Sequence, residues 1–469
     1  MKEFTLIELI EGLRQNKWTS VDLVHMYLGQ IEKYDGYLNS VAELNPDALQ
    51  IAKELDEERL AKGPRSHLHG IPILIKDNIN TKDKMHTTAN SLSLADLIAP
   101  YEATIVRKLK DAGVIILGKA NLSEFAYFMS YDQMPSGYGS RNGQVKSPYH
   151  ESIDPLGSST GSAVAVAANL ICVAIGTETN GSLMAPAYQN SIVAIKPTFG
   201  MVSRYGIIPI SETQDTAGPI AKNVADCALL LEVIAGFDDL DPYTKDYKNH
   251  LQDIKNAFLK PIINGKIGII YYSDHTYSAE EKEILEQTRA KFISLGYTVK
   301  IIDFEPRKGD WKESLLSLFY EFKNGINAYL KSVSGYTKMT SLKDIIEFNL
   351  RDPEKRMKYG QSILVDSQKT TGNFNDEEYI EFRKNLLIEA NRLENMMQEE
   401  NLDALLSTTW ASYAPVAGNP SICVPAKPLT DLKPISIIFV GKKWDDAKLI
   451  SIAHEYEQAT KHRIPPQLA

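Results

Sequence analysis

The sequence is poor in cysteine. Its 469 residues include only three, Cys172, Cys227 and Cys423, which lie far apart and form no C-x-x-C pair. An odd number of isolated cysteines argues against a disulfide framework and against a zinc site, and it suits a reducing compartment. We therefore expect the three thiols to be small apolar core residues, and we expect no metal and no cofactor.

An excess of basic residues and long hydrophobic runs are absent as well. The net charge is −9, whereas a nucleic-acid-binding protein needs a basic face for the phosphates. No stretch approaches the ~20 apolar residues that cross a bilayer, and charged residues interrupt the N-terminal segment, which lacks the apolar run of a signal peptide. We expect a soluble, cytoplasmic protein that acts on neither nucleic acid nor membrane.

No internal repeat, low-complexity tract or Gly/Ser linker divides the chain. Apolar residues at helical spacing predict helices through residues 4–62. The run IPILIKDNI predicts a buried strand, and a helix over 102–112 leads into a strand at GVIILGKAN, so the three elements predict a parallel β-α-β unit. Residues 265–304 repeat the strand–helix–strand pattern.

From about residue 306 to 408 the chain is rich in Lys, Glu, Asn, Tyr and Phe at helical spacing. We expect a helical layer that covers one end of a sheet. The tail returns to strands at SICVPA and PISIIFVG and ends in a helix. A chain that leaves a sheet and comes back predicts an α/β fold, with one large domain and a mixed, twisted central sheet covered by helices on both faces.

The segment LGSSTGSAVAVAANLICVAIGTETNGSLMAPA, residues 156–187, has a hydroxyl-rich turn at each end of an apolar middle. We expect a buried helix over 161–175. The first turn fits the G-x-S-x-G pattern of a nucleophile elbow around Ser159, but an elbow follows a buried strand. The preceding HESIDPL is polar and is broken by Pro155, which argues against an elbow.

The second turn, Asn180-Gly181-Ser182, follows an apolar run. Small residues permit positive φ here, so several backbone N–H groups can point at one spot beside the serine oxygen, as in an oxyanion hole. The alternative is a tight turn into which small residues simply fit, and the turn alone does not decide between the two.

A nucleophilic serine needs a base, which is usually histidine. The nine histidines lie in polar stretches such as HLHG and KHR, whereas Lys76 ends the apolar run IPILI. Burial disfavours the charged ammonium and lowers the pKa of a lysine, so a neutral Lys76 could accept a proton. The alternative is a surface lysine whose ammonium reaches solvent.

Four stretches together resemble the amidase signature family: LIKDNI, LGSSTGSAVAVAANL, GTETNGSLMAPA and AIKPTFGMVSRYGIIPISETQDTAGP. The resemblance extends to GVIILGKANLSEFA and AGNPSICVPA and covers nearly the whole chain. It implies a Ser–cis-Ser–Lys triad made of the nucleophile Ser182, the bridging Ser158 and the base Lys76. The peptide bond Gly157–Ser158 is then cis, and Ser159 supports the site. The implied oxyanion hole consists of the backbone N–H groups of Thr179, Asn180, Gly181 and Ser182.

The resemblance also implies the organisation and the reaction. Residues 1–469 would form one amidase domain, with N-terminal helices in 1–65, the signature core in 66–305, a helical layer near the substrate pocket in 306–410, and strands and a helix that complete the core in 411–469. Lys76 would draw a proton through Ser158 while Ser182 attacks an amide carbonyl, and water would then release the acid from the acyl-enzyme.

The second turn departs from the family's common T-D-T-G-G-S-I-R, because Glu178 replaces aspartate, Asn180 replaces glycine and Met184 replaces arginine. The usual acid–arginine pair is therefore in doubt. The T-E-T-x-G-S form resembles the peptide amidase-like branch, which hydrolyses C-terminal carboxamides of peptides. We expect a small-molecule or short-peptide amide as substrate, and a monomer or homodimer.

Two other functions compete with this one. An amidotransferase A-type subunit shares the triad but works with partner subunits, and this chain lacks the G-G-S-I-R turn and the basic surface. A non-catalytic homologue used for binding would have lost a triad residue, and all three are present. The aromatic and glycine-rich loop 125–145, with Tyr127, Phe128, Met129 and Ser130, is expected to line the substrate pocket together with the 306–410 layer, the alternative being structural packing of its tyrosines.

Overall fold

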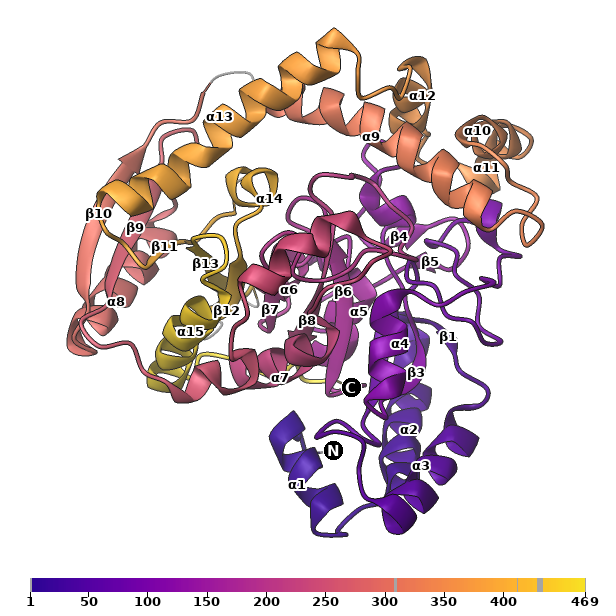
Figure 1. The fold of residues 1–469 in the computed structure, drawn as a ribbon, viewed down its shortest axis with the longest axis horizontal. Helices are drawn as coiled ribbons and strands as arrows, with labels where there is room; N and C mark the ends of the chain where they lie inside the picture. Colours follow the sequence, from indigo (N-terminus) through magenta and orange to yellow (C-terminus); the bar gives the residue numbers. More distant parts are fainter. Residues whose placement is uncertain (1, 308–309, 411, 428–432, 469) are drawn as a thin grey trace.

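A computed structural model describes residues 2–307, 310–410, 412–427 and 433–468. One mixed sheet runs through the molecule with the strand order β1-β3-β2-β6-β8-β7-β12-β13-β11-β9-β10, and β4 and β5 form a separate hairpin. The predicted α/β fold with helices around a mixed central sheet is confirmed (Figure 1).

The strands are β1 (Val41–Leu44), β2 (Pro72–Lys76), β3 (Ile115–Ala120), β4 (Tyr138–Gly139), β5 (Gly143–Gln144), β6 (Val173–Glu178), β7 (Val193–Lys196), β8 (Thr216–Ala221), β9 (Lys266–Tyr272), β10 (Thr298–Phe304), β11 (Ala404–Ser407), β12 (Ser421–Lys427) and β13 (Ile435–Gly441). The helices are α1 (Leu6–Arg14), α2 (Ser20–Leu38), α3 (Ala48–Lys62), α4 (Thr104–Asp111), α5 (Thr160–Ala167), α6 (Met184–Gln189), α7 (Val224–Ile234), α8 (Ala279–Ser294), α9 (Asp310–Ser332), α10 (Leu342–Leu350), α11 (Pro353–Arg356), α12 (Ser362–Lys369), α13 (Glu377–Glu399), α14 (Tyr413–Ala417) and α15 (Asp446–Thr460).

Both predicted parallel units are present. β2 pairs in parallel with β3 after the crossover helix α4, and β9 pairs in parallel with β10 after α8. Helix α8 begins where the sequence allows a capping box, since the Ser278 hydroxyl accepts from the Glu281 N–H and the Glu281 carboxylate accepts from the Ser278 N–H. Local sequence therefore places these elements correctly.

The expected helix over 161–175 is wrong in its second half. Helix α5 ends at Ala167, Asn169 adopts a left-handed φ of 56°, and β6 begins at Val173. Both β6 and α5 are buried along their whole length, so neither shows an alternation of apolar and polar residues. A continuous apolar run reads the same for a buried helix and a buried strand, which is why the sequence pattern misses the change.

The expected helical layer is formed by α9–α13, which arch over one end of the molecule (Figure 1). The predicted span, 306–410, includes residues 308–309, which lie outside the described part of the chain, and it also contains the strand β11. The layer has its own hydrophobic cluster, in which Phe322 of α9 packs its ring against Phe125 and Phe128 of the 125–134 loop. The loop is therefore held against the helical layer.

None of the helices in the described residues is long and apolar enough to cross a membrane.

The packing of Phe439 in the main hydrophobic core predicts the effect of truncating its side chain. Phe439 of β13 is fully buried, with its ring centroid 6.2 Å from that of Phe292 and 5.7 Å from that of Tyr456. Phe439→Ala is expected to lower the free energy of unfolding by about 3–5 kcal/mol, because the cavity cannot close fully. Urea denaturation followed by circular dichroism measures the change. Ile380→Ala, at a position that is 51% exposed, is the control and should have little effect.

Candidate active site

Two parallel strands bring the site together. β2 pairs with β6 through Leu74 with Ala174 and Ile75 with Ile175, so the carboxyl ends of the two strands lie side by side. Lys76 is the last residue of β2, and Thr177 lies one residue before the end of β6. The pairing places the lysine side chain next to a hydroxyl that is 101 positions away in the sequence.

The Lys76 ammonium is fully buried and surrounded by hydroxyl groups. Its Nζ lies 2.8 Å from Ser158 Oγ, 3.0 Å from Ser159 Oγ and 2.9 Å from Thr177 Oγ1. Burial lowers the pKa of Lys76 to about 7, although the negative charges of Asp215 and Glu178 oppose the change. A large fraction of Lys76 is therefore neutral near pH 7, and neutral Nζ can accept a proton from Ser158.

The first serine turn is hydrogen-bonded to β6 and to the second turn. The Gly157–Ser158 peptide bond is cis. The Ser159 hydroxyl donates to the Thr177 carbonyl at 2.9 Å and accepts from the Thr177 N–H at 3.1 Å, and the Ser159 N–H donates to the Ser182 carbonyl at 3.3 Å. Ser159 thus connects the turn to β6 and to the second turn. No strand directly precedes it in the described residues, in agreement with the argument against a nucleophile elbow.

The second turn presents Ser182 to a cavity. Gly181 has φ of 80°, and Ser182 is buried except where it lines the cavity. Within the described part of the chain, the backbone N–H groups of all four predicted residues, Thr179, Asn180, Gly181 and Ser182, donate to no protein acceptor. These are the free donors that an oxyanion hole requires.

The side chains of Glu178, Thr179 and Asn180, in and before the second turn, are hydrogen-bonded to groups beyond the turn. The Asn180 amide donates to Ser412 Oγ at 2.8 Å, and the Thr179 hydroxyl donates to Asp215. Glu178 accepts from the backbone N–H groups of Leu183 at 2.7 Å and Met184 at 3.1 Å. The glutamate therefore caps the backbone that follows Ser182, where the family's common sequence has an acid–arginine pair.

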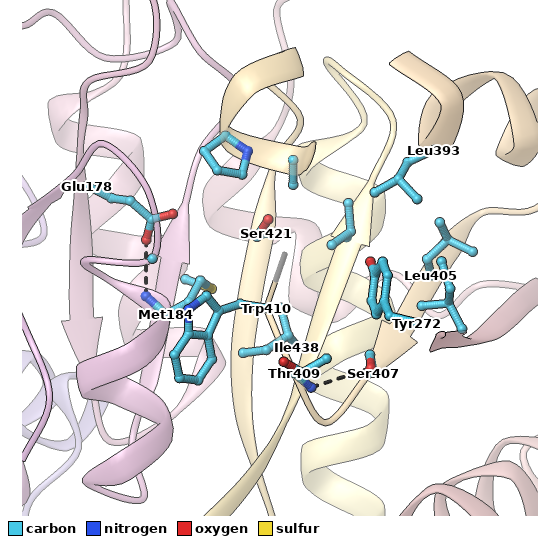
Figure 2. A pocket seen from close by; sticks show the side chains of 15 residues that line it. Glu178, Met184, Tyr272, Leu393, Leu405, Ser407, Thr409, Trp410, Ser421 and Ile438 are labelled. Carbon is cyan, nitrogen blue, oxygen red and sulfur yellow. Dashed lines mark hydrogen bonds between the residues drawn. The ribbon is translucent and has the colours of Figure 1, made fainter. Parts of the chain in front are cut away.

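A small cavity of about 20 Å³ lies beside this turn, lined by Glu178, Met184 and Trp410 (Figure 2). It has room for about one water molecule. A Cβ on Gly181 would lie 3.0 Å from the Trp410 indole nitrogen, so only glycine leaves ordinary space for the indole here. The indole covers the turn on this side.

The large cavity next to Ser182 has a volume of about 890 Å³. Its walls come from the 126–134 loop, from α9, α12 and α13 of the helical layer, and from the segment around Trp410. Of the four predicted lining residues, Tyr127, Phe128 and Ser130 reach the cavity. Met129 does not line it, because its side chain turns into the second hydrophobic cluster.

The loop turns in an unusual way at this point. Phe125, Ala126 and Tyr127 have successive left-handed φ values of 49°, 55° and 72°. The Tyr127 hydroxyl donates to the Met134 carbonyl at 2.6 Å, and the Tyr131 N–H donates to Ser362 Oγ of α12 at 3.2 Å. Sequence reasoning did not anticipate this turn, because no glycine or asparagine marks it.

Three residues of the site were missed by the sequence analysis. Thr177 accepts from Lys76, Asp215 accepts from the Thr179 hydroxyl, and Trp410 covers Gly181. Thr177 and Asp215 lie in GTETNGS and ETQDTAGP, stretches that the sequence analysis had already singled out as similar to the family. Nothing in the local sequence marks Trp410.

Residues 22–416 match the family described as Amidase. The chain belongs to this family. A probable amidase of Arabidopsis thaliana is 37% identical over 100% of this chain and 92% of its own length. The A-type subunit of the glutamyl-tRNA(Gln) amidotransferase of Acinetobacter baumannii is 31% identical over 98% of this chain and 96% of its own.

Among solved structures, the peptide amidase of Stenotrophomonas maltophilia superposes on this amidase with a TM-score of 0.91, at 39% identity and over 99% of both chains. The similarity to the amidase signature family that the sequence indicated is confirmed, and the peptide amidase structure is a near relative in fold. The chain is an enzyme that hydrolyses amides.

The Glu178 cap predicts a graded response to substitution. Glu178→Ala leaves two buried N–H groups without an acceptor, and each such loss costs about 1–3 kcal/mol. We expect a large drop in the free energy of unfolding and in kcat. Glu178→Gln keeps an acceptor oxygen at the same place and should preserve most of both. Chemical denaturation and amidase assays of the two variants test this, and equal damage from both substitutions would contradict a hydrogen-bonding role.

Proposed function

We propose that this amidase hydrolyses C-terminal carboxamides of peptides to the free acid and ammonia, with Ser182 as nucleophile, Ser158 as bridge and Lys76 as base. The observation that carries the proposal is the buried Lys76 Nζ, 2.8 Å from Ser158 Oγ and with its pKa lowered to about 7. A base with a pKa near the working pH transfers protons most effectively.

The Lys76–Ser158 contact supports the following acylation step, in which Ser158 passes the proton between Ser182 and Lys76. Neutral Lys76 accepts the Ser158 proton, Ser158 accepts the Ser182 proton, and Ser182 Oγ bonds to the amide carbonyl carbon. The free N–H groups of Thr179, Asn180, Gly181 and Ser182 are expected to stabilise the oxyanion. The proton then returns through Ser158 to the amide nitrogen, the C–N bond breaks and ammonia leaves.

Deacylation uses the same groups in reverse order. A water molecule gives a proton to the relay and attacks the acyl carbon, and the Ser182 oxygen leaves and recovers its proton. The acid is released, and one water molecule has been consumed for each amide. Lys76 and the two hydroxyls end in their starting protonation states.

The large cavity supports a peptide as substrate. Its volume of about 890 Å³ lies within the range of small-molecule sites, which is about 300–1,000 Å³. Leu315, Leu318 and Leu386 give it apolar walls beyond Ser182. The solved peptide amidase structure similar to this chain supports the same substrate class. We propose that Tyr127 and Phe128 select the side chain next to the scissile amide.

The competing function is that of an amidotransferase A-type subunit. The similarity to the Acinetobacter baumannii protein favours it, at 31% identity over nearly the whole chain. A protein of that type would pass ammonia on with the help of partner subunits. A protein that releases ammonia from peptide amides by itself, as we propose, needs no such partner.

The first test is ammonia release from a C-terminally amidated dipeptide by the purified protein. The wild-type protein is expected to release ammonia, and Ser182→Ala and Lys76→Ala are each expected to lower kcat by at least about 10³-fold, because the groups of a triad act as a unit. Ser152→Ala, at an exposed position outside the site, is the control and should keep full activity. Absence of release by the wild-type protein would contradict the peptide amidase proposal.

The pH profile tests the lysine separately. Lys76 must be neutral to act as a base, and burial lowers its pKa to about 7. The acylation rate is therefore expected to rise as the pH increases through about 7 and then to level off. Stopped-flow measurement of the acylation rate between pH 5 and pH 9 checks this, because that range extends about two pH units on either side of the lowered pKa. A rate that falls with increasing pH in this window would exclude Lys76 as the base.

A further inference from the structure

Besides the water-sized space near Trp410, a further cavity of about 270 Å³ adjoins the large one and is called the second cavity below. Ala126, Thr179 and Ile210 line both cavities, so the two meet beside the nucleophile turn. The inner wall of the second cavity includes Thr177, whose hydroxyl accepts from Lys76. Its outer rim includes the exposed side chain of Leu240. The second cavity thus extends from the partners of the lysine to the surface.

The charged residues in its wall are mostly acidic. Arg204 forms two hydrogen bonds with Asp241, at 2.9 and 2.7 Å, so their charges compensate each other. Glu212 and Asp215 also line the cavity and leave it with an excess of negative charge. Asp215 is partly exposed, although it accepts from the Thr179 hydroxyl and from two backbone N–H groups. A cavity of this charge favours a cation.

An uncharged acceptor lies in the same wall. Asn78 is buried, and its amide nitrogen donates to Thr177 Oγ1 at 3.0 Å. Its amide oxygen has no hydrogen-bond partner among the described residues. A buried acceptor without a donor costs free energy, so a ligand that brings N–H groups is favoured here.

We propose that the second cavity binds the ammonium ion, or a small primary alkylammonium ion, and is the route by which the leaving group of the amide departs. The leaving nitrogen receives its proton from the relay of Ser158 and Lys76, and the second cavity begins at Thr177, on the relay side of the site. Ammonia takes up a proton from water on release and then carries the charge that Glu212 and Asp215 attract. The direction of departure rests on the proposed function, whereas cation binding can be measured without catalysis.

The experiment is a titration of ¹³C-methylammonium with the Ser182→Ala protein, followed by the NMR line width of the methyl group. Saturable broadening is expected. Ammonium chloride should reverse it, and tetramethylammonium chloride at equal ionic strength should not, because that ion has no N–H donors. Unsaturable broadening, or equal competition by both salts, would overturn the proposal.

Two pairs of variants, each made in the Ser182→Ala protein, test whether methylammonium binds in the second cavity. Glu212→Gln keeps the acceptor for the Tyr243 hydroxyl but removes one charge from the wall, and should weaken binding at least about threefold. Glu283→Gln, on the exposed surface of α8, is its control. Ala328→Phe places a large ring on α9 at the exposed mouth of the cavity and should weaken binding strongly, whereas Ala328→Ser should not. Equal affinity in all four variants would overturn the proposal.

The two proposals fail separately. If methylammonium binds as described but the wild-type protein releases no ammonia from amides, the proposed function is wrong and the cation site remains. If ammonia is released but methylammonium does not bind, or binds without regard to Glu212 and Ala328, the second cavity is not the product site. Product inhibition of the wild-type enzyme by ammonium, and its loss in Ala328→Phe, would support both.

Discussion

The burial of the Lys76 ammonium is the constraint on which the site depends. A buried lysine loses its hydration, and here the cost is offset by hydroxyl oxygens of Ser158, Ser159 and Thr177 rather than by a carboxylate in direct contact. This choice of partners has a chemical consequence. A contacting carboxylate would hold the lysine in its charged form, whereas hydroxyls can both accept from the ammonium and donate to the amine. The same environment therefore places Lys76 and keeps part of it neutral.

The turns around the lysine are stabilised by groups that do not themselves face the large cavity. Ser159 bonds to both backbone groups of Thr177 and to the Ser182 carbonyl, and Glu178 accepts from the N–H groups that follow Ser182. These bonds use the N–H groups of Thr177, Leu183 and Met184, whereas the N–H groups of residues 179–182 donate to no acceptor in the described structure. Under the proposed mechanism, the oxyanion hole consists of the N–H groups that the supporting residues leave without an acceptor.

The helical layer gives this site its surroundings. Aromatic packing between Phe322 and the 125–134 loop fixes the wall of the large cavity, and the left-handed turn at Ala126 lines both that cavity and the second one. One backbone segment therefore borders both spaces. Under the proposals made above, the peptide would lie on one side of this segment and the departing ammonium on the other.

The sequence by itself determined the family and the candidate catalytic groups: a lysine at the end of an apolar strand, a serine pair, and a further serine in a glycine turn, within stretches similar to one family. It also placed the two parallel units, because local apolar patterns and caps decide them. The sequence misplaced the end of α5, because a buried helix and a buried strand share the same apolar pattern. It also placed the Met129 side chain in the cavity wall, because the local sequence does not show which way a loop residue points. Only the tertiary structure decided that Lys76 meets Ser158 and Thr177, respectively 82 and 101 positions away, because contacts of this range depend on strand order and register rather than on local sequence.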